Sequence, residues 1–172
     1  MKIAVLSDSH MKKKRSQNVI DHLVQCGAEF FIHAGDIGTK ETLDQLKNTK
    51  LKYVAVYGNN DASLVQYHSD YNLVQEPYTF KVATTTMKLM HMPFYMNADA
   101  EVIISGHTHI FHAEQKSGVL FLNPGEVCAR EKPLVECAML EITKESFEVT
   151  HYFKDPKAKK FDQRKFNFKR AS

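Results

Sequence analysis

Two histidines separated by one residue lie in the segment VIISGHTHIFH, residues 102–112. Side chains alternate along an extended chain, so His107 and His109 are expected to project to one side and Thr108 to the other. Gly106, just before them, lets the backbone bend or approach another group closely. Two imidazoles that point the same way at a strand end are typical of a metal site, although loop histidines that bind nothing are also common.

Candidate ligands also follow four other apolar segments of the chain. They are Asp8-Ser9-His10, Gly35-Asp36, Gly58-Asn59-Asn60-Asp61 and His91. Each has an ordinary explanation when taken alone, because Asp, Asn and Gly are common turn residues and a single histidine is more often packed in a core. Ligand sites in open α/β sheets form beyond the carboxyl ends of the strands. Five strand ends with ligand residues therefore jointly favour a metal site.

The ligand types limit the metal. Oxygen and imidazole donors suit Mn²⁺, Zn²⁺ or Fe, and no cysteine is expected among them, which disfavours iron–sulfur clusters and structural zinc. Two aspartates, four histidines and one asparagine are too many for one ion, but they can hold two ions if one carboxylate bridges. Two metals roughly 3.5–4 Å apart promote in-line displacement at phosphorus. The predicted ligands are Asp8, His10, Asp36, Asn59, His91, His107 and His109.

The elements that must position these residues follow an alternating pattern in the first half of the chain. Apolar segments predict strands over 2–8, 29–36 and 51–61, and helical periodicity predicts helices over 16–27 and 39–48, the second capped by Thr39. This order implies right-handed crossovers and a parallel sheet covered by helices.

The second half reads as a second, mostly antiparallel or mixed sheet. We expect a hairpin over 78–91 with its turn near 83–86, then strands with short connections over 101–107, 110–115, 118–125, 136–143 and 147–153. The predicted fold class is α/β, a sandwich of two sheets flanked by helices.

Composition fits one globular domain. The chain has 172 residues, 43% hydrophobic and 25% charged, with no apolar run near the roughly 18 residues of a membrane helix. The N-terminus becomes polar too soon for a signal peptide. Three cysteines without a C-x-x-C pair favour reduced thiols, so we expect a cytoplasmic protein.

The net charge of +3 is unevenly distributed. Residues 154–172 carry eight Lys/Arg and two Asp, a net +6, whereas the other 153 residues carry fifteen basic and eighteen acidic groups, a net −3. We therefore divide the chain into a domain over 1–153 and a basic C-terminal tail over 154–172, expected to be a partly ordered extension. Its phenylalanines could suit nucleic acid, but the acidic body makes nucleic acid an unlikely substrate.

The series D-x-H, G-D, G-N-x-D, H and G-H-T-H resembles the calcineurin-like metallophosphoesterase family, in particular its small single-domain bacterial and archaeal phosphodiesterase branch. The stretch N-P-G at 123–125 matches this branch too. The resemblance implies a four-layer α/β/β/α fold and a phosphodiesterase acting on a small phosphoester, with two divalent ions, manganese first and zinc or iron next. Small relatives often form dimers, so a homodimer is weakly favoured.

The resemblance also assigns roles to residues. Asp8, His10 and His109 would hold one metal, Asn59, His91 and His107 the other, and Asp36 would bridge them. A metal-bound hydroxide would attack phosphorus in line. Asn60 and Asp61 are the expected catalytic residues. Since Asn60 stands where many members have a histidine that protonates the leaving group, we expect aryl phosphodiesters to be cleaved far better than alkyl monoesters.

Two further departures from the family affect the site. Residues 92–100 are too few for a crossover with a helix, so a turn is expected there. Either the site would be more open on that flank or His91 would be held less firmly. Glu126 replaces a small residue and is expected to be exposed, with a hydrogen bond to a ligand histidine as the alternative. We expect Arg130 to form a surface salt bridge, with a contact to a substrate phosphate as the alternative, and His33 to pack or support a ligand.

A non-catalytic scaffold of the same fold, one that binds proteins through its surface, is the alternative function. Scaffold branches of the family have typically lost some of the ligands, including the histidine of D-x-H. All seven positions are filled here, which favours an enzyme.

Overall fold

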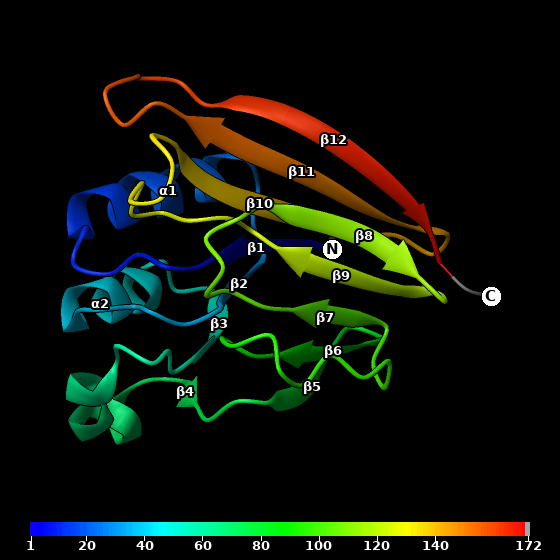
Figure 1. The fold of residues 1–172 in the computed structure, drawn as a ribbon, viewed down its shortest axis with the longest axis horizontal. Coiled ribbons are helices and arrows are strands. Elements are labelled where there is room, and N and C mark those ends of the chain that lie inside the picture. Colours follow the sequence, from blue (N-terminus) through cyan, green and yellow to red (C-terminus); the bar gives the residue numbers. More distant parts are fainter. Residues whose placement is uncertain (171–172) are drawn as a thin grey trace.

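The computed structural model describes residues 1–170, which form two β-sheets packed face to face with helices on one side (Figure 1). The helices are α1 (Lys13–Gln25), α2 (Lys40–Asn48) and the 3₁₀ helix η1 (Ala62–Asp70). None of the described helices is long and apolar enough to span a membrane. The predicted two-sheet sandwich is confirmed.

The larger sheet has seven strands in the order β12-β11-β10-β1-β2-β3-β4. The pairs β1–β2, β2–β3 and β3–β4 are parallel, as the alternating pattern predicted, and β10, β11 and β12 are added antiparallel. The strands are β1 (Lys2–Leu6), β2 (Phe30–His33), β3 (Lys52–Val56), β4 (Leu73–Val74), β10 (Val135–Ile142), β11 (Ser146–Lys154) and β12 (Asp162–Lys169).

The smaller sheet has five strands in the order β5-β6-β7-β9-β8. The hairpin predicted over 78–91 forms, and β6, β7 and β9 run parallel to one another. The strands are β5 (Tyr78–Val82), β6 (Thr85–Leu89), β7 (Val102–Ile104), β8 (His112–Lys116) and β9 (Val119–Asn123).

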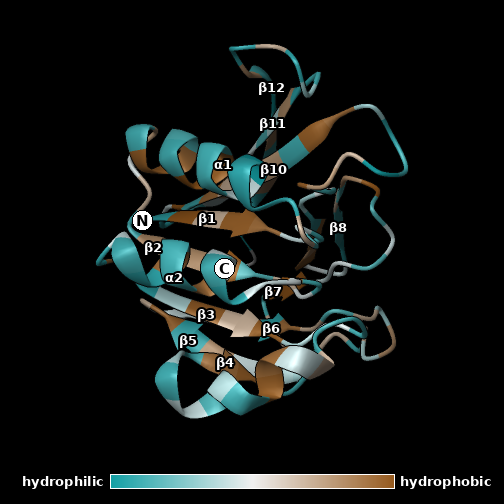
Figure 2. Ribbon diagram, turned by 90° about the vertical axis from the view of Figure 1, so that its left-hand side faces the viewer, coloured by the Kyte–Doolittle hydropathy of each residue, from teal (hydrophilic) through white to brown (hydrophobic). Residues whose placement is uncertain are grey.

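Alternating side chains separate two cores on the two faces of the larger sheet. Ile3 and Val5 of β1 point toward the smaller sheet and pack with residues such as Leu89 and Ile104, whereas Ala4 and Leu6 pack under α1. Figure 2 shows the hydrophobic residues concentrated in β1 while α1 and α2 turn hydrophilic residues outward. This packing fixes the sheet register, so the strand ends that carry the predicted ligands are held in place.

Helix boundaries differ slightly from those predicted. The first helix begins at Lys13 instead of residue 16, because Lys13, Lys14 and Arg15 are good helix formers that carry no apolar periodicity to reveal them. Thr39 caps α2 as predicted, its hydroxyl accepting a hydrogen bond from the Thr42 amide at 3.4 Å. β4 and η1 were not predicted, since β4 has two residues and η1 buries only Leu64.

The segment 92–100 contains no helix, as its length predicted. It lies over the outer face of the smaller sheet, where Met96 and Ala100 pack with Ile103. Lys88 is buried on this face and its Nζ lies 2.6 Å from the carboxylate of Asp99. The fourth layer is therefore a loop fixed by apolar contacts and one ion pair.

The basic segment 154–172 differs from the expected partly ordered extension. β12 pairs with β11 from Asp162 opposite Phe153 to Lys169 opposite Ser146, so that expectation is wrong for residues 162–169 (Figure 1). Phe166 and Phe168 pack against the core between the sheets. Residues 171–172 of this segment lie outside the described residues, and a domain limit at residue 153 stays a prediction.

Candidate metal centre

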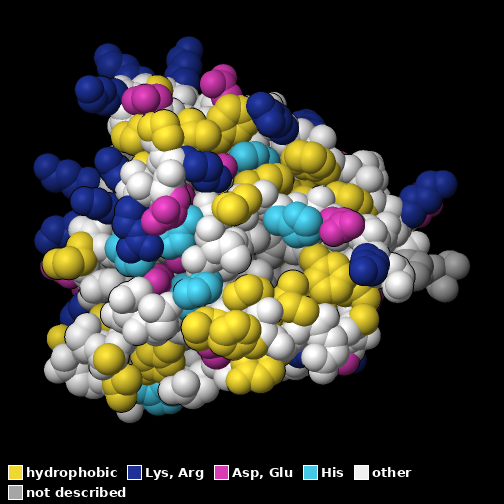
Figure 3. Space-filling model, in the orientation of Figure 1, with side chains coloured by type: hydrophobic (Ala, Val, Ile, Leu, Met, Phe, Trp, Pro, Cys, Tyr) yellow, Lys and Arg dark blue, Asp and Glu magenta, His cyan; other side chains and the backbone are white. Residues whose placement is uncertain are grey.

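The seven predicted ligands come together at the carboxyl ends of β1, β2 and β3 in one sheet and after β6 and β7 in the other. On this face of the molecule, histidine side chains lie beside acidic and basic ones (Figure 3). We call Asp8, His10 and His109 the Asp8 half, and Asn59, His91 and His107 the His91 half. His109 Nε2 lies 3.2 Å from Asp8 Oδ1, and His91 Nε2 lies 3.0 Å from Asn59 Oδ1.

Asp36 lies between the two halves. Its Oδ2 is 3.7 Å from His10 Nε2 and its Oδ1 is 3.5 Å from His91 Nε2. Within the halves, the rings of His10 and His109 stack with centroids 5.4 Å apart, and those of His91 and His107 meet edge to face at 5.1 Å. One carboxylate with an oxygen toward each half is the arrangement that a bridging ligand requires.

Unsatisfied buried atoms fit a cation in this space. Asp8 is fully buried; its Oδ2 accepts hydrogen bonds from Ser7 Oγ at 2.6 Å and from the His107 amide at 3.1 Å. Its Oδ1 makes no well-directed hydrogen bond, and neither does the buried His10 Nε2 among the described residues. Buried polar atoms are normally hydrogen-bonded, so these two atoms without a hydrogen bond are suitable as ligand atoms for divalent ions.

Backbone strain is concentrated at the ligands. Positive φ angles of 46–65° occur at five of the seven predicted ligands, namely Asp8, His10, Asp36, His107 and His109. Such angles are uncommon outside glycine and cost on the order of 1–3 kcal/mol each. Two glycines allow neighbouring side chains to approach the backbone closely. A Cβ on Gly35 would clash with the His91 ring, and one on Gly106 would clash with Ser7 Oγ.

Glu126 is fully buried, so the expectation that it is exposed is wrong and the alternative holds. Its Oε2 lies 2.7 Å from His109 Nδ1, and its carboxylate accepts hydrogen bonds from the backbone amides of Arg130, Glu131 and Lys132. Burial raises the pKa of Glu126, but hydrogen bonds from Cys128, His109 and these amides lower it to about 2. A carboxylate therefore fixes the orientation of a predicted ligand histidine.

Cys128 also lies beside the candidate ligands, and the expectation that no cysteine is itself a metal ligand stays a prediction. Its Sγ is 3.8 Å from His109 Nδ1 and donates to Glu126 Oε2 at 3.0 Å. Burial raises the pKa of this thiol, so it stays a donor to the carboxylate. Its ligand atom is close enough to those of His10 and His109 for one ion.

His91 is held firmly, contrary to the concern about the short segment after it. It is fully buried, with Nδ1 2.9 Å from the carbonyl oxygen of Ala34. Glu76 accepts hydrogen bonds from the amides of His91 and Met92, at 2.5 and 2.9 Å. Sequence patterns gave no sign of this contact, because Glu76 is fifteen residues away from His91 in the chain.

Asn123 and His33 stabilise the loops around the candidate ligands. Asn123, of the N-P-G stretch, donates to the carbonyl oxygen of Gly106 at 2.8 Å and fixes the turn before the histidine pair. His33 is fully buried with Nε2 2.9 Å from Ser9 Oγ, which confirms that it packs in the interior, beside the loop that carries Asp8 and His10. Burial lowers the pKa of His33 to about 4, so it is neutral near pH 7.

Asn60 and Asp61 are placed differently from each other. Asn60 is exposed at the surface of the site, and its Nδ2 donates a hydrogen bond to Asp36 Oδ2 at 2.7 Å. Asp61 is fully buried and accepts hydrogen bonds from the amides of Ile37, Gly38 and Gly58 at 2.8–3.0 Å. Asp61 therefore joins the loops after β2 and β3.

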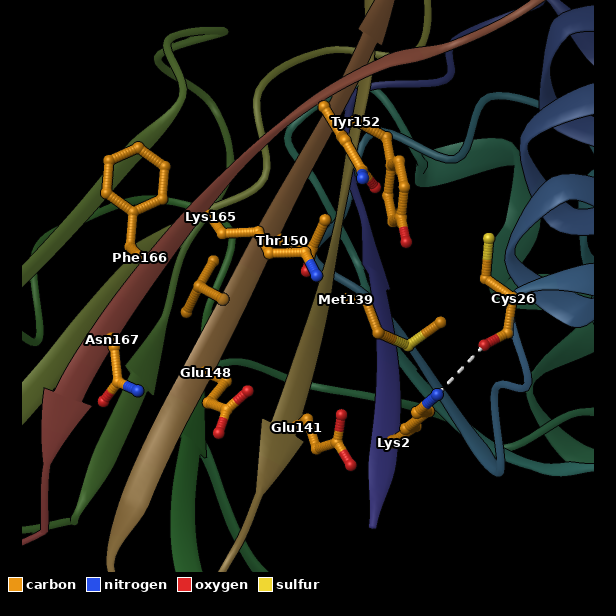
Figure 4. Close-up of a pocket in the computed structure, with 12 residues that line it drawn as sticks. Lys2, Cys26, Met139, Glu141, Glu148, Thr150, Tyr152, Lys165, Phe166 and Asn167 are labelled. Carbon is orange, nitrogen blue, oxygen red and sulfur yellow. Dashed lines mark hydrogen bonds between the residues drawn. The ribbon is translucent and has the colours of Figure 1, made fainter.

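Arg130 forms the expected surface ion pair, with Nε 3.3 Å from Glu131 Oε1. Its other end reaches the site, since Nη2 lies 3.1 Å from His109 Nε2. A separate cavity of about 270 Å³ lies on the face of β10, β11 and β12, and Figure 4 shows its side chains, among them Lys2, Glu148 and Lys165. None of the predicted site residues lines that cavity.

Comparisons with known proteins agree with these observations. A model of the calcineurin-like phosphoesterase superfamily domain matches residues 1–145. The chain is 24% identical over 160 residues to "Phosphodiesterase MJ0936" of Methanocaldococcus jannaschii, covering 86% of this chain and 96% of the relative. It is 31% identical over 159 residues to "Probable metallophosphoesterase MJ0623" of the same organism, covering 83% and 76%.

Solved structures share the fold. A single mutant of Vps29 from Entamoeba histolytica matches with a TM-score of 0.78 at 21% identity, covering 98% of this chain and 99% of that one. YfcE, a phosphoesterase from E. coli, matches with a TM-score of 0.69 at 20% identity, covering 95% and 98%. At these identities the likeness shows the fold alone.

Proposed function

Because the chain belongs to the calcineurin-like phosphoesterase superfamily, we propose that it is a two-metal phosphodiesterase that hydrolyses a small or exposed phosphoester. The observation that carries the proposal is the position of Asp36, which directs one oxygen toward His10 and the other toward His91. The names of the relatives, which include phosphodiesterases, support the reaction class.

The two halves would each hold one ion, with Asp36 as the bridge. When bound, the two ions would supply a hydroxide for in-line attack on phosphorus and neutralise charge on the phosphate oxygens. Manganese is our first expectation, with zinc or iron next; a Vps29 from Entamoeba histolytica is known in complex with zinc. The oxygen and imidazole donors accept all three metals.

The chain's own residues orient this reaction. Asn60 holds Asp36 Oδ2 and presents an amide at the surface of the site, where it can donate to a phosphate oxygen but cannot act as a general acid. Glu126 holds His109 in one orientation. We assign Asp61 a positioning role, because both of its oxygens are used by backbone amides of the two loops.

The test is hydrolysis of bis-p-nitrophenyl phosphate by metal-stripped protein, with Mn²⁺, Zn²⁺, Ni²⁺ or Mg²⁺ added back singly. We expect metal-dependent turnover that is lost in Asp36→Asn, a substitution of nearly the same size. Asp70→Asn, in an exposed position at the end of η1, is the matched control and keeps its turnover. Absence of turnover with every metal would contradict the proposal and favour the scaffold.

A further inference from the structure

A second cavity, of about 480 Å³, adjoins the candidate metal centre. It lies between the start of α1 and the segment 128–130, and His10 belongs to both the cavity and the Asp8 half. Its volume is in the range of sites for small molecules. We call it the cationic cavity; its lining residues are His10, Met11, Lys12, Arg15, Cys128, Ala129 and Arg130.

Positive charge in the cationic cavity is balanced only in part, by the ion pair of Arg130 with Glu131, which does not line the cavity. Three of its side chains, Lys12, Arg15 and Arg130, carry a positive charge, and none of the described residues that line it carries a carboxylate. Lys12 is exposed and forms no ion pair within residues 1–170, whereas its neighbour Lys13 pairs with Glu41 at 3.2 Å. A concave surface lined by one sign of charge attracts ligands of the opposite sign.

Arg15 and Arg130 have different parts in this cavity. The guanidinium of Arg15 donates to the carbonyl oxygen of Cys128 and so ties α1 to the segment 128–130. Arg130 Nη2 contacts His109 Nε2, the nitrogen that is free for a metal because Nδ1 is used by Glu126. A cation on Nε2 would exclude this contact, which frees the guanidinium of Arg130 for a ligand in the cavity.

The cavity also offers apolar surface. Met11 is 77% exposed, the largest exposed fraction among the large hydrophobic side chains of the described residues, and it lines the cavity together with Ala129. The methylene stems of Lys12 and Arg15 add to this surface. The cationic cavity therefore combines positive charge with apolar surface.

We propose that the cationic cavity binds a second anionic group of the substrate, next to the phosphodiester that is cleaved. The favoured substrate class is then a phosphodiester that also carries a further phosphate and an apolar or aromatic group, as in a nucleotide with two phosphates. This inference rests on the proposed function, because the cleaved group must lie at the metal centre that His10 shares with the cavity.

Two substrates that differ only in the second phosphate test this proposal. They are the p-nitrophenyl ester of thymidine 5′-monophosphate and the same ester with an additional 3′-phosphate. Both release p-nitrophenol, so the chemistry at the cleaved bond is the same. For the metal-loaded protein we expect kcat/KM to be at least ~10-fold higher for the ester with two phosphates, the size of a charge-assisted contact, mostly through a lower KM.

Variants then assign the preference to the cavity. Lys12→Ala and Arg130→Ala should each reduce the ratio of the two kcat/KM values by ~3–10-fold, and more at low salt, where screening is weaker. Lys14→Ala is the matched control. The substitution removes the same charge from the same helix start, but Lys14 does not line the cavity. The ratio should be unchanged in that variant.

The outcomes separate this inference from the proposed function. If the protein cleaves bis-p-nitrophenyl phosphate, either of two results overturns the inference about the cationic cavity and leaves the proposed function standing. They are a wild-type ratio of the two kcat/KM values near 1, and a ratio that Lys14→Ala changes as much as Lys12→Ala does. If no diester is cleaved, binding decides: calorimetry with thymidine 3′,5′-bisphosphate and thymidine 5′-monophosphate should still show tighter binding of the bisphosphate, weakened by Lys12→Ala. Equal binding of the two nucleotides overturns the inference.

Discussion

The two halves of the candidate metal centre are enclosed to different degrees. In the Asp8 half, Asp8 and His109 are both buried, and the buried Glu126 lies behind His109. In the His91 half only His91 is buried, Asn59 is exposed, and the supporting carboxylate of Glu76 contacts backbone amides instead of an imidazole. A charged partner on a ligand imidazole raises its basicity. The Asp8 half should therefore bind its metal first and more tightly.

Removing one imidazole from each half tests this difference most strongly. His109→Ala should lower turnover on the order of 10³-fold, about 4 kcal/mol of transition-state stabilisation. It should also remove the tighter of two metal-binding steps in calorimetry. His107→Ala should remove the weaker step and leave the tighter one. Loss of the same step in both variants would show that the halves do not differ.

Glu126 is the residue that most distinguishes the Asp8 half. Glu126→Gln keeps the shape but removes the charge beside His109, so the tighter metal-binding step should weaken by ~10–100-fold. Competition with a chelating dye measures this constant without reference to activity. Glu114→Gln, at an exposed position, is the control and should bind metal as the wild type does. An unchanged constant in Glu126→Gln would mean that Glu126 only stabilises the loop.

Asn60 tests the substrate side of the site that both halves share. Asn60→His restores a group that can protonate a leaving oxygen, so the rate on an alkyl phosphate monoester should rise by at least ~10-fold relative to bis-p-nitrophenyl phosphate. Rates on the two substrates are measured with the same metal. Similar wild-type rates on both substrates would contradict the expected preference for good leaving groups.

Sequence motifs pointed to the candidate ligands more readily than to the residues that surround them. Asp8, Asp36 and His107 were predicted as ligands because each follows an apolar strand within a short motif. The contact of Glu126 with His109 depends on how β10 returns beside β1, which no local pattern contains. Cys128 was missed for the same reason, since its contact with Glu126 exists only once the loop is folded.

The last strand was missed for a different reason, because its signal was present. Phe166 and Phe168 alternate with Lys165 and Asn167, a strand pattern with one apolar face. The high positive charge of residues 154–172 favoured an extension instead. Charged edge strands are common because charge prevents pairing with other chains, so basic character alone does not exclude a strand.

Substitution of Glu76 should have the smallest effect of these variants, and it should affect only the His91 half. It accepts hydrogen bonds from the amides of His91 and Met92, so it fixes the backbone of the His91 half without adding charge to an imidazole. Glu76→Gln should therefore weaken only the second metal-binding step, by ~3–5-fold, since one hydrogen bond contributes about 0.5–1.5 kcal/mol. Calorimetric titration with Mn²⁺ measures both steps in one experiment. A weakened first step with an unchanged second step would reverse the order of the two halves, because Glu76 has no contact with the Asp8 half among the described residues.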